Sequence, residues 1–159
     1  AVRSYRAIQR RVPGARFIWV GDGPALPGLK REHPDFVYCG MRRDADLARH
    51  FASTDLFLFP SLTETFGNVT LEALASGVPV VAYDYGAARE HVRDGVHGRT
   101  IGCGDEAAFV AAAVELAADA AMRQRMRAAG TAAVAALSPR GVAADLAALL
   151  ASMIARRAA

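Results

Sequence analysis

The sequence has 159 residues, of which 53% are hydrophobic and 22% charged, and this composition excludes an intrinsically disordered chain. The length suits one domain. The net charge of +3 is only mildly basic, and the arginines that crowd the first segment have no interleaved aromatic residue beyond Tyr5, so we expect no nucleic-acid partner.

Short apolar runs alternate with helical patterns over the first hundred residues. The runs are bounded by Gly, Pro or Asp and are rich in β-branched or aromatic residues, which is typical of buried strands. Strands are predicted at 17–20, 36–39, 55–59, 79–82 and 98–101. Helices are predicted at 2–11, 27–32, 44–52, 67–76 and 87–93. This alternation predicts an α/β fold in which right-handed crossovers build a doubly wound parallel sheet.

The alternation stops after residue 104. Three further helices are predicted at 105–118, 119–136 and 139–157, in a region that is rich in alanine. Asp105 and Ser138 are candidate N-cap residues, and Pro139 then occupies the first helical position.

Cys39 and Cys103 lack any metal-binding or redox spacing, which favours a reduced, cytoplasmic compartment. No apolar run reaches the ~20 residues of a membrane-spanning helix. The chain begins at Ala1, inside a helical pattern, so we expect it to be a piece of a larger protein.

The stretch "PSLTETFGNVTLEALASG" at 60–77 carries the candidate chemistry. It follows the strand at 55–59, and ligands bind beyond the carboxyl ends of strands in a doubly wound sheet. Gly67 lets the backbone approach a ligand, and the helix begins near Asn68 with free N–H groups that suit a phosphate or diphosphate. Gly77 is expected to end the same helix.

Two glutamates, Glu64 and Glu72, bracket this anion site. A carboxylate repels a phosphate but accepts two hydrogen bonds from a vicinal diol. One diol on each side of a diphosphate describes a nucleotide sugar, with a hexose at one end and a ribose at the other. The alternative interpretation is that Glu64 is a solvated loop residue and Glu72 an exposed helix residue.

The segment "FLFPSLTETFGNVTLEALASGVPVVAYDYGAAREHVRDGVHG" at 57–98 resembles the C-terminal, donor-binding domain of family 4 retaining glycosyltransferases of the GT-B fold. Its motif is Glu, seven residues, Glu, followed by Ala-Ser-Gly-x-Pro-Val-Val-Ala. "VGDGP" at 20–24 and "YCG" at 38–40 match the same family. The resemblance implies a Rossmann-like domain. Within the family, the segment is most similar in sequence to bacterial lipid- or glycan-directed mannosyl- and glucosyltransferases.

The resemblance implies a role for each matched residue. Glu64 would be the catalytic-site residue that binds hydroxyls of the donor hexose, and Glu72 would hold the ribose diol. The remaining donor-binding positions act largely through backbone. The sugar and diphosphate would meet the amides of Phe66, Gly67, Asn68, Val69 and Thr70; the phosphates would lie near Gly21, Gly23 and Pro24; and the base would lie along Met41, Arg42 and Arg43.

Several of these positions have plainer interpretations. In this interpretation Asp22 caps a turn and has no other role, and Arg42 and Arg43 are surface charges. His91 and His97 are interpreted as surface or packing residues. Glu90 matches a glutamate that follows an Asp-x-Gly-Gly loop in the family, but the loop here reads "DYGAA", which leaves the role of Glu90 open.

The resemblance also implies two parts of the family's enzymes that have no counterpart ahead of Val2 in this sequence. These are the domain's first strand, with an arginine and a lysine that neutralise the donor diphosphate, and an entire N-terminal acceptor domain. Because these parts are needed for transfer, we expect the fragment alone to be inactive. We also expect the parent enzyme to work in the cytoplasm, peripherally at the inner face of the membrane.

The function expected is metal-independent transfer of a hexosyl group, with retention, from a UDP- or GDP-linked donor to a lipid or glycan acceptor. No cofactor or metal is expected beyond the nucleotide-sugar substrate. Two alternatives stay open: another GT-B enzyme, such as a sugar-nucleotide epimerase or phosphorylase, and a non-catalytic nucleotide-sugar-binding domain. Activity of the full-length protein on labelled donors would separate them.

Overall fold

A computed structural model describes residues 1–135 and 137–158 of the chain. The strands are β1 Ile18–Val20, β2 Val37–Gly40, β3 Phe57–Phe59, β4 Val80–Tyr83 and β5 Gly98–Ile101. The helices are α1 Val2–Arg11, α2 Leu26–Glu32, α3 Asp44–Ala52, α4 Val69–Ala75, α5 Gly86–His91, α6 Glu106–Ala118, α7 Ala120–Ala135 and α8 Pro139–Ala158. Every predicted element is confirmed to within two residues at each end, apart from position 136 of the predicted helix 119–136, which lies outside the described residues.

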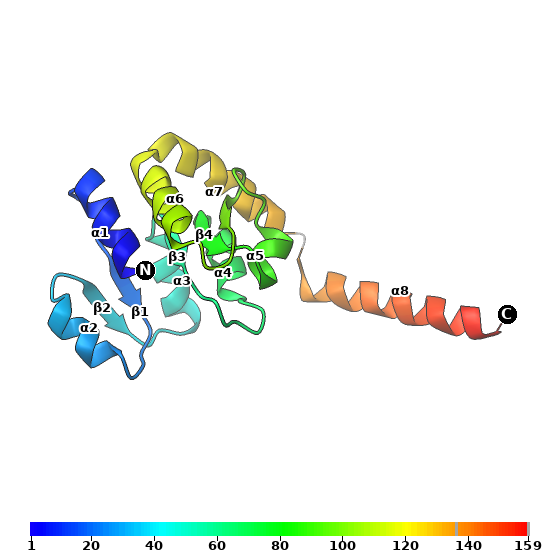
Figure 1. The fold of residues 1–159 in the computed structure, drawn as a ribbon. Coiled ribbons are helices and arrows are strands. Elements are labelled where there is room, and N and C mark those ends of the chain that lie inside the picture. Colours follow the sequence, from blue (N-terminus) through cyan, green and yellow to red (C-terminus); the bar gives the residue numbers. More distant parts are fainter. Residues whose placement is uncertain (136, 159) are drawn as a thin grey trace.

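All strand pairs are parallel, as predicted, but they form two sheets (Figure 1). One sheet pairs β1 with β2, and the other has the order β3-β4-β5. Among the described strands, no ladder joins β1 to β3. The two parts of the fold instead meet where α1 packs along α6.

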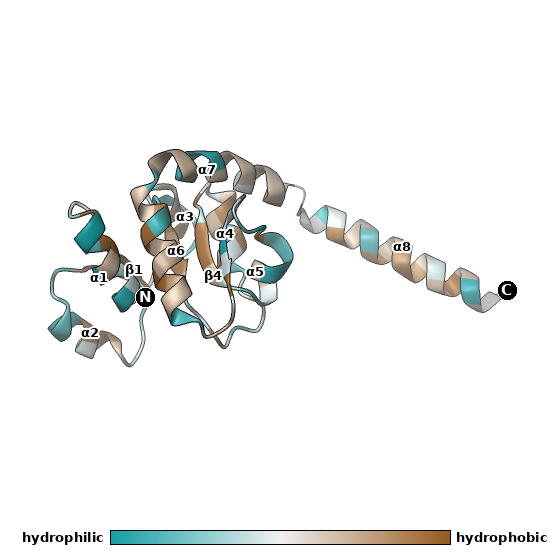
Figure 2. Ribbon diagram, turned by 45° about the horizontal axis from the view of Figure 1, so that its top comes forward, coloured by the Kyte–Doolittle hydropathy of each residue, from teal (hydrophilic) through white to brown (hydrophobic). Residues whose placement is uncertain are grey.

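The central strand β4 is buried on both faces because helices cover each side of its sheet. Val80 and Ala82 pack in one apolar cluster with residues of α3, α4 and α5, whereas Val81 and Tyr83 pack in a second with residues of α6 and α7. Successive residues of a strand point to opposite faces, so four consecutive apolar residues supply both layers. Figure 2 shows the hydrophobic β4 enclosed by these helices.

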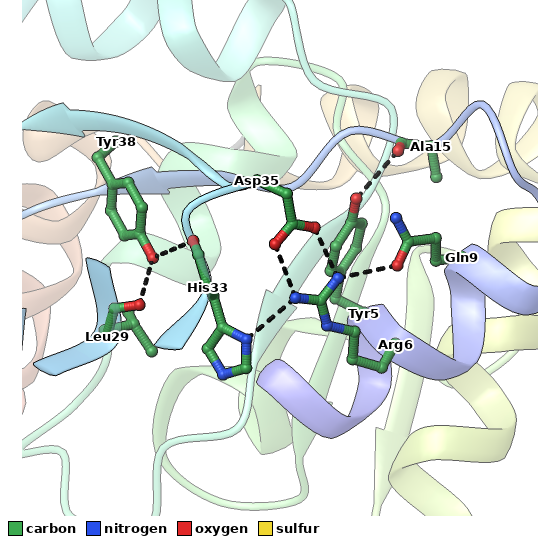
Figure 3. A network of polar contacts seen from close by, with 8 residues as sticks. All are labelled: Tyr5, Arg6, Gln9, Ala15, Leu29, His33, Asp35 and Tyr38. Carbon is green, nitrogen blue, oxygen red and sulfur yellow. Dashed lines mark hydrogen bonds and ion pairs between the residues drawn. The ribbon is translucent and has the colours of Figure 1, made fainter. Parts of the chain in front are cut away.

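Arg6 ties α1 to the start of β2 (Figure 3). Its guanidinium donates to both carboxylate oxygens of Asp35, at 2.6 and 2.8 Å, and lies 4.8 Å from the centre of the Phe36 ring. The Tyr38 hydroxyl lies 2.9 Å from the carbonyl oxygens of Leu29 and His33, which fixes α2 against β2. These contacts hold the β1–β2 part of the domain together.

The last helix leaves the body of the domain (Figure 1). The predicted cap is confirmed, because the Ser138 hydroxyl accepts from the Gly141 N–H at 3.0 Å. Asp105 likewise caps α6 by accepting from the Ala108 N–H at 2.9 Å. Within the described residues no single helix is long and apolar enough to cross a membrane; α7 and Arg140–Arg156 of α8, bent by 46°, pass the length and composition test only as a pair.

Candidate functional site

The loop between β3 and α4 leaves β3 at its carboxyl end, where sequence reasoning placed it. α4 begins at Val69, two residues later than predicted, and Asn68 is its N-cap residue. Gly67 has φ +89°, a left-handed conformation that side chains disfavour. Among the described residues, the N–H groups of Phe66, Gly67 and Asn68 find no protein acceptor, so they remain able to donate to a ligand.

Glu64 lies beside this turn. A Cβ atom on Gly67 would be 3.8 Å from both Cβ and Cγ of Glu64, so the glutamate stem runs along the Gly67 backbone. The Ser61 hydroxyl donates to Glu64 Oε1 at 2.8 Å, which leaves most of the carboxylate's acceptor capacity available. Glu72 is exposed on the first turn of α4. Both carboxylates are therefore accessible to hydroxyl donors of a ligand.

The start of α5 holds the same loop, and sequence reasoning did not assign this role. The Tyr85 hydroxyl accepts from the Glu64 N–H at 3.0 Å, and the Ala87 N–H donates to the Phe66 carbonyl oxygen at 2.7 Å. A Cβ atom on Gly86 would lie 2.4 Å from that same oxygen, so only glycine fits there. The signal available in the sequence was the "DYGAA" loop.

His91 packs edge-on against Phe66, with ring centroids 6.1 Å apart, and lies 3.7 Å from the Glu90 carboxylate. This contact agrees with its interpretation as a packing residue. An open hollow of about 770 Å³ lies between α7 and residues 89–97, but no residue of the β3–α4 loop lines it, and neither does Glu72. We place the candidate site at the loop because the unused N–H groups and Glu64 lie there, with Glu72 on the first turn of the helix that follows.

The loops after β1 and β2 are joined to each other. The N–H of Gly21, which has φ +130°, donates to the Gly40 carbonyl oxygen at 2.9 Å. The Asp22 carboxylate accepts from the Gly23 N–H at 2.8 Å, so it does cap the turn that leads to Pro24. Among the described residues, no hydrogen bond joins these loops to the β3–α4 loop.

The predicted base-side residues follow β2. Met41 is 57% exposed, and Arg42 pairs with Asp46 at 3.2 Å instead of pointing freely from the loop. The sequence does contain an Asp-x-Asp pair, Asp44 and Asp46, which is the spacing of some metal sites. Asp46 is shared between Arg42 and His50, and the described residues contain no group of three or more metal-ligating side chains.

Comparison with known proteins adds the family. The model of the family "Glycosyl transferases group 1" matches residues 1–119. The chain belongs to this family. A GDP-mannose-dependent alpha-(1-6)-phosphatidylinositol monomannoside mannosyltransferase from Mycolicibacterium smegmatis is 35% identical over a 142-residue alignment that covers 81% of this chain and 37% of that protein. The matched segments span 15–37% of the lengths of such curated relatives.

Solved structures give the fold of this glycosyltransferase chain. HepE from Anabaena, in complex with UDP-glucose, superposes with a TM-score of 0.77 and 25% identity over 95% of this chain and 44% of that one. The C-terminal domain of a group 1 glycosyltransferase, LpcC from Francisella tularensis, gives a TM-score of 0.71 at 19% identity and covers 84% of this chain and 77% of that one. The fold is thus the Rossmann-like fold of GT-B glycosyltransferases.

Proposed function

We propose that this chain is the donor-binding, C-terminal half of a family 4 retaining glycosyltransferase. The parent enzyme transfers a hexosyl group from UDP- or GDP-hexose to a lipid or glycan acceptor. It works without a metal or cofactor, in the cytoplasm and peripherally at the inner face of the membrane, where a lipid acceptor would be reached.

One observation carries the proposal: Glu64 runs along Gly67, directly before the unused N–H groups at the start of α4. A diphosphate at those N–H groups would have the Glu64 carboxylate on its hexose side and Glu72 on its ribose side. The relatives support a nucleotide-sugar donor, because one is named as GDP-mannose-dependent and a solved neighbour holds UDP-glucose.

In the proposed reaction, the site stabilises the negative charge that develops on the leaving group. As the bond between the sugar and the phosphate breaks, negative charge grows on the diphosphate leaving group. N–H donors that are already aimed at that position, near Phe66, Gly67 and Asn68, stabilise the charge without reorganising during the reaction. Glu64 would orient the hexose by accepting hydrogen bonds from its hydroxyl groups.

The division into two sheets supports the proposal that the domain's first strand is supplied from ahead of Ala1. β1 pairs only with β2, and β3 pairs only with β4, so each keeps a free edge within the described residues. A parallel strand between β1 and β3 would join the two sheets into one. The same missing segment would bring the arginine and the lysine that face the donor diphosphate, and the acceptor domain would precede it.

The test uses the full-length parent enzyme with labelled UDP- and GDP-hexoses and candidate lipid or glycan acceptors, with and without EDTA. We expect transfer from one donor class, unaffected by EDTA, to a product with the anomeric configuration of the donor. Residues 1–159 alone should give none. Conversion of the donor without an acceptor, or binding without turnover, would contradict the proposal in favour of an epimerase or a binding domain.

A further inference from the structure

The exposed loop that carries Glu64 is held by the residues that begin α5. Among the described residues, the backbone of residues 61–66 makes two hydrogen bonds with other parts of the chain. Ala87 holds the Phe66 carbonyl oxygen through its own main chain. The Tyr85 hydroxyl holds the Glu64 N–H at 3.0 Å. Tyr85 is therefore the side chain that fixes the part of the loop containing Glu64.

The Tyr85 ring is itself anchored in the domain. It packs against the apolar cluster of Val81, Ile101 and Phe109, together with Leu56 and Leu58. Its own N–H donates to the Tyr83 carbonyl oxygen at 2.9 Å. A ring held in this way keeps its hydroxyl at one position, whereas a solvent-exposed side chain would lose that order by rotating among its rotamers.

We propose that Tyr85 is a positioning residue for sugar transfer. An amide N–H can only donate, so the phenolic oxygen must accept, and this single bond fixes the main chain at Glu64. Because the Glu64 stem then runs along Gly67, the bond sets where its carboxylate meets the donor hexose. This inference rests on the proposed function and adds to it the residue that places Glu64.

The experiment measures kcat and KM for the nucleotide sugar, and binding of the free nucleoside diphosphate, in the full-length parent enzyme. The variants are Tyr85→Phe, Glu64→Gln and the double substitution. Tyr83→Phe is the matched control, because it removes a hydroxyl two residues earlier from a buried ring that packs against Phe109. Phenylalanine keeps the apolar packing of each ring, and melting temperatures check that each variant folds.

Tyr85→Phe should lower kcat/KM for the nucleotide sugar roughly three- to tenfold, as expected for one lost hydrogen bond, and leave nucleoside diphosphate binding unchanged. It should have no further effect in the Glu64→Gln background, since it acts through that carboxylate. Tyr83→Phe should behave as wild type.

Wild-type kinetics for Tyr85→Phe, an equal effect in both backgrounds, or weakened nucleoside diphosphate binding would overturn the inference alone. Absence of both transfer and nucleoside diphosphate binding in the wild type would overturn the proposed function, and this inference with it.

Discussion

At two glycines, an added Cβ atom would meet the backbone of another segment of the chain. A Cβ atom on Gly98 would lie 2.1 Å from the Val80 carbonyl oxygen, inside the β4–β5 ladder, and one on Gly86 would lie 2.4 Å from the Phe66 carbonyl oxygen. In both cases the atom in the way belongs to the backbone, which cannot rotate aside as a side chain can. The first contact belongs to the core and the second to the candidate site.

Gly98→Ala should destabilise the domain by roughly 1–3 kcal/mol or more, because the new methyl group must push β4 and β5 apart. Chemical unfolding of residues 1–159 measures the loss. Gly102→Ala is the matched control, since a Cβ atom there meets nothing within 4 Å. Equal stability of the two variants would contradict the close contact between Gly98 and the Val80 backbone.

The Arg6–Asp35 pair makes part of the stability depend on pH. The guanidinium that donates to both carboxylate oxygens holds the pKa of Asp35 below its ordinary value of 3.8. A lowered pKa stabilises the fold above the ordinary value, and that contribution is lost as the pH falls through the folded-state pKa.

The difference in melting temperature between wild type and Asp35→Asn should therefore be present at about pH 7 and shrink below about pH 3.8. Thermal unfolding at both pH values measures it. A difference that grows on acidification would contradict the sign of the effect. Because both side chains are partly exposed, we expect the difference to be small even at neutral pH.

Among the helices, α8 differs from the others because its large apolar side chains are exposed. Leu149, Leu150, Met153 and Ile154 are each more than half exposed. The helix projects away from the body of the domain (Figure 1).

Replacing those four residues of α8 by glutamine should leave the melting temperature of residues 1–159 unchanged, because side chains that are already exposed lose no burial. Leu116→Gln is the contrasting variant, since Leu116 is fully buried in α6 and its change should lower the melting temperature strongly. A fall of several degrees in the α8 variant would mean that the helix packs on the domain.

Helices and strands with a clear hydrophobic pattern, or with a recognisable cap or turn residue at an end, could be predicted from the sequence. The buried run at 79–82, the caps Asp105 and Ser138, and the turn at Gly77 all depend on local pattern, and each was confirmed. Gly77 has φ +71° just after α4 ends. The separation into two sheets was missed, since strand alternation says nothing about which strands share a ladder.

Within the site, local reasoning placed Glu64 and Gly67 in one loop but missed Tyr85. That residue reaches Glu64 through a hydrogen bond across 21 positions in the chain. A contact between a side chain and distant backbone leaves no periodic signal in the sequence. Long-range contacts of this kind required the structure.

In the proposed function, the two glutamates divide one donor between them. Glu72 would hold the ribose and Glu64 the hexose, and a hydrogen bond to a charged group contributes about 1.5–3 kcal/mol. Free nucleoside diphosphate contains the ribose but no hexose. The two carboxylates should therefore respond differently to that one ligand.

Calorimetry with nucleoside diphosphate on the parent enzyme, paired with turnover, tests this division most directly. Glu72→Gln should weaken nucleoside diphosphate binding by roughly tenfold or more, whereas Glu64→Gln should leave it almost unchanged and lower turnover by roughly tenfold or more. Equal weakening of nucleoside diphosphate binding by both substitutions, or no effect of either on binding or turnover, would contradict the assignment of hexose to Glu64 and ribose to Glu72.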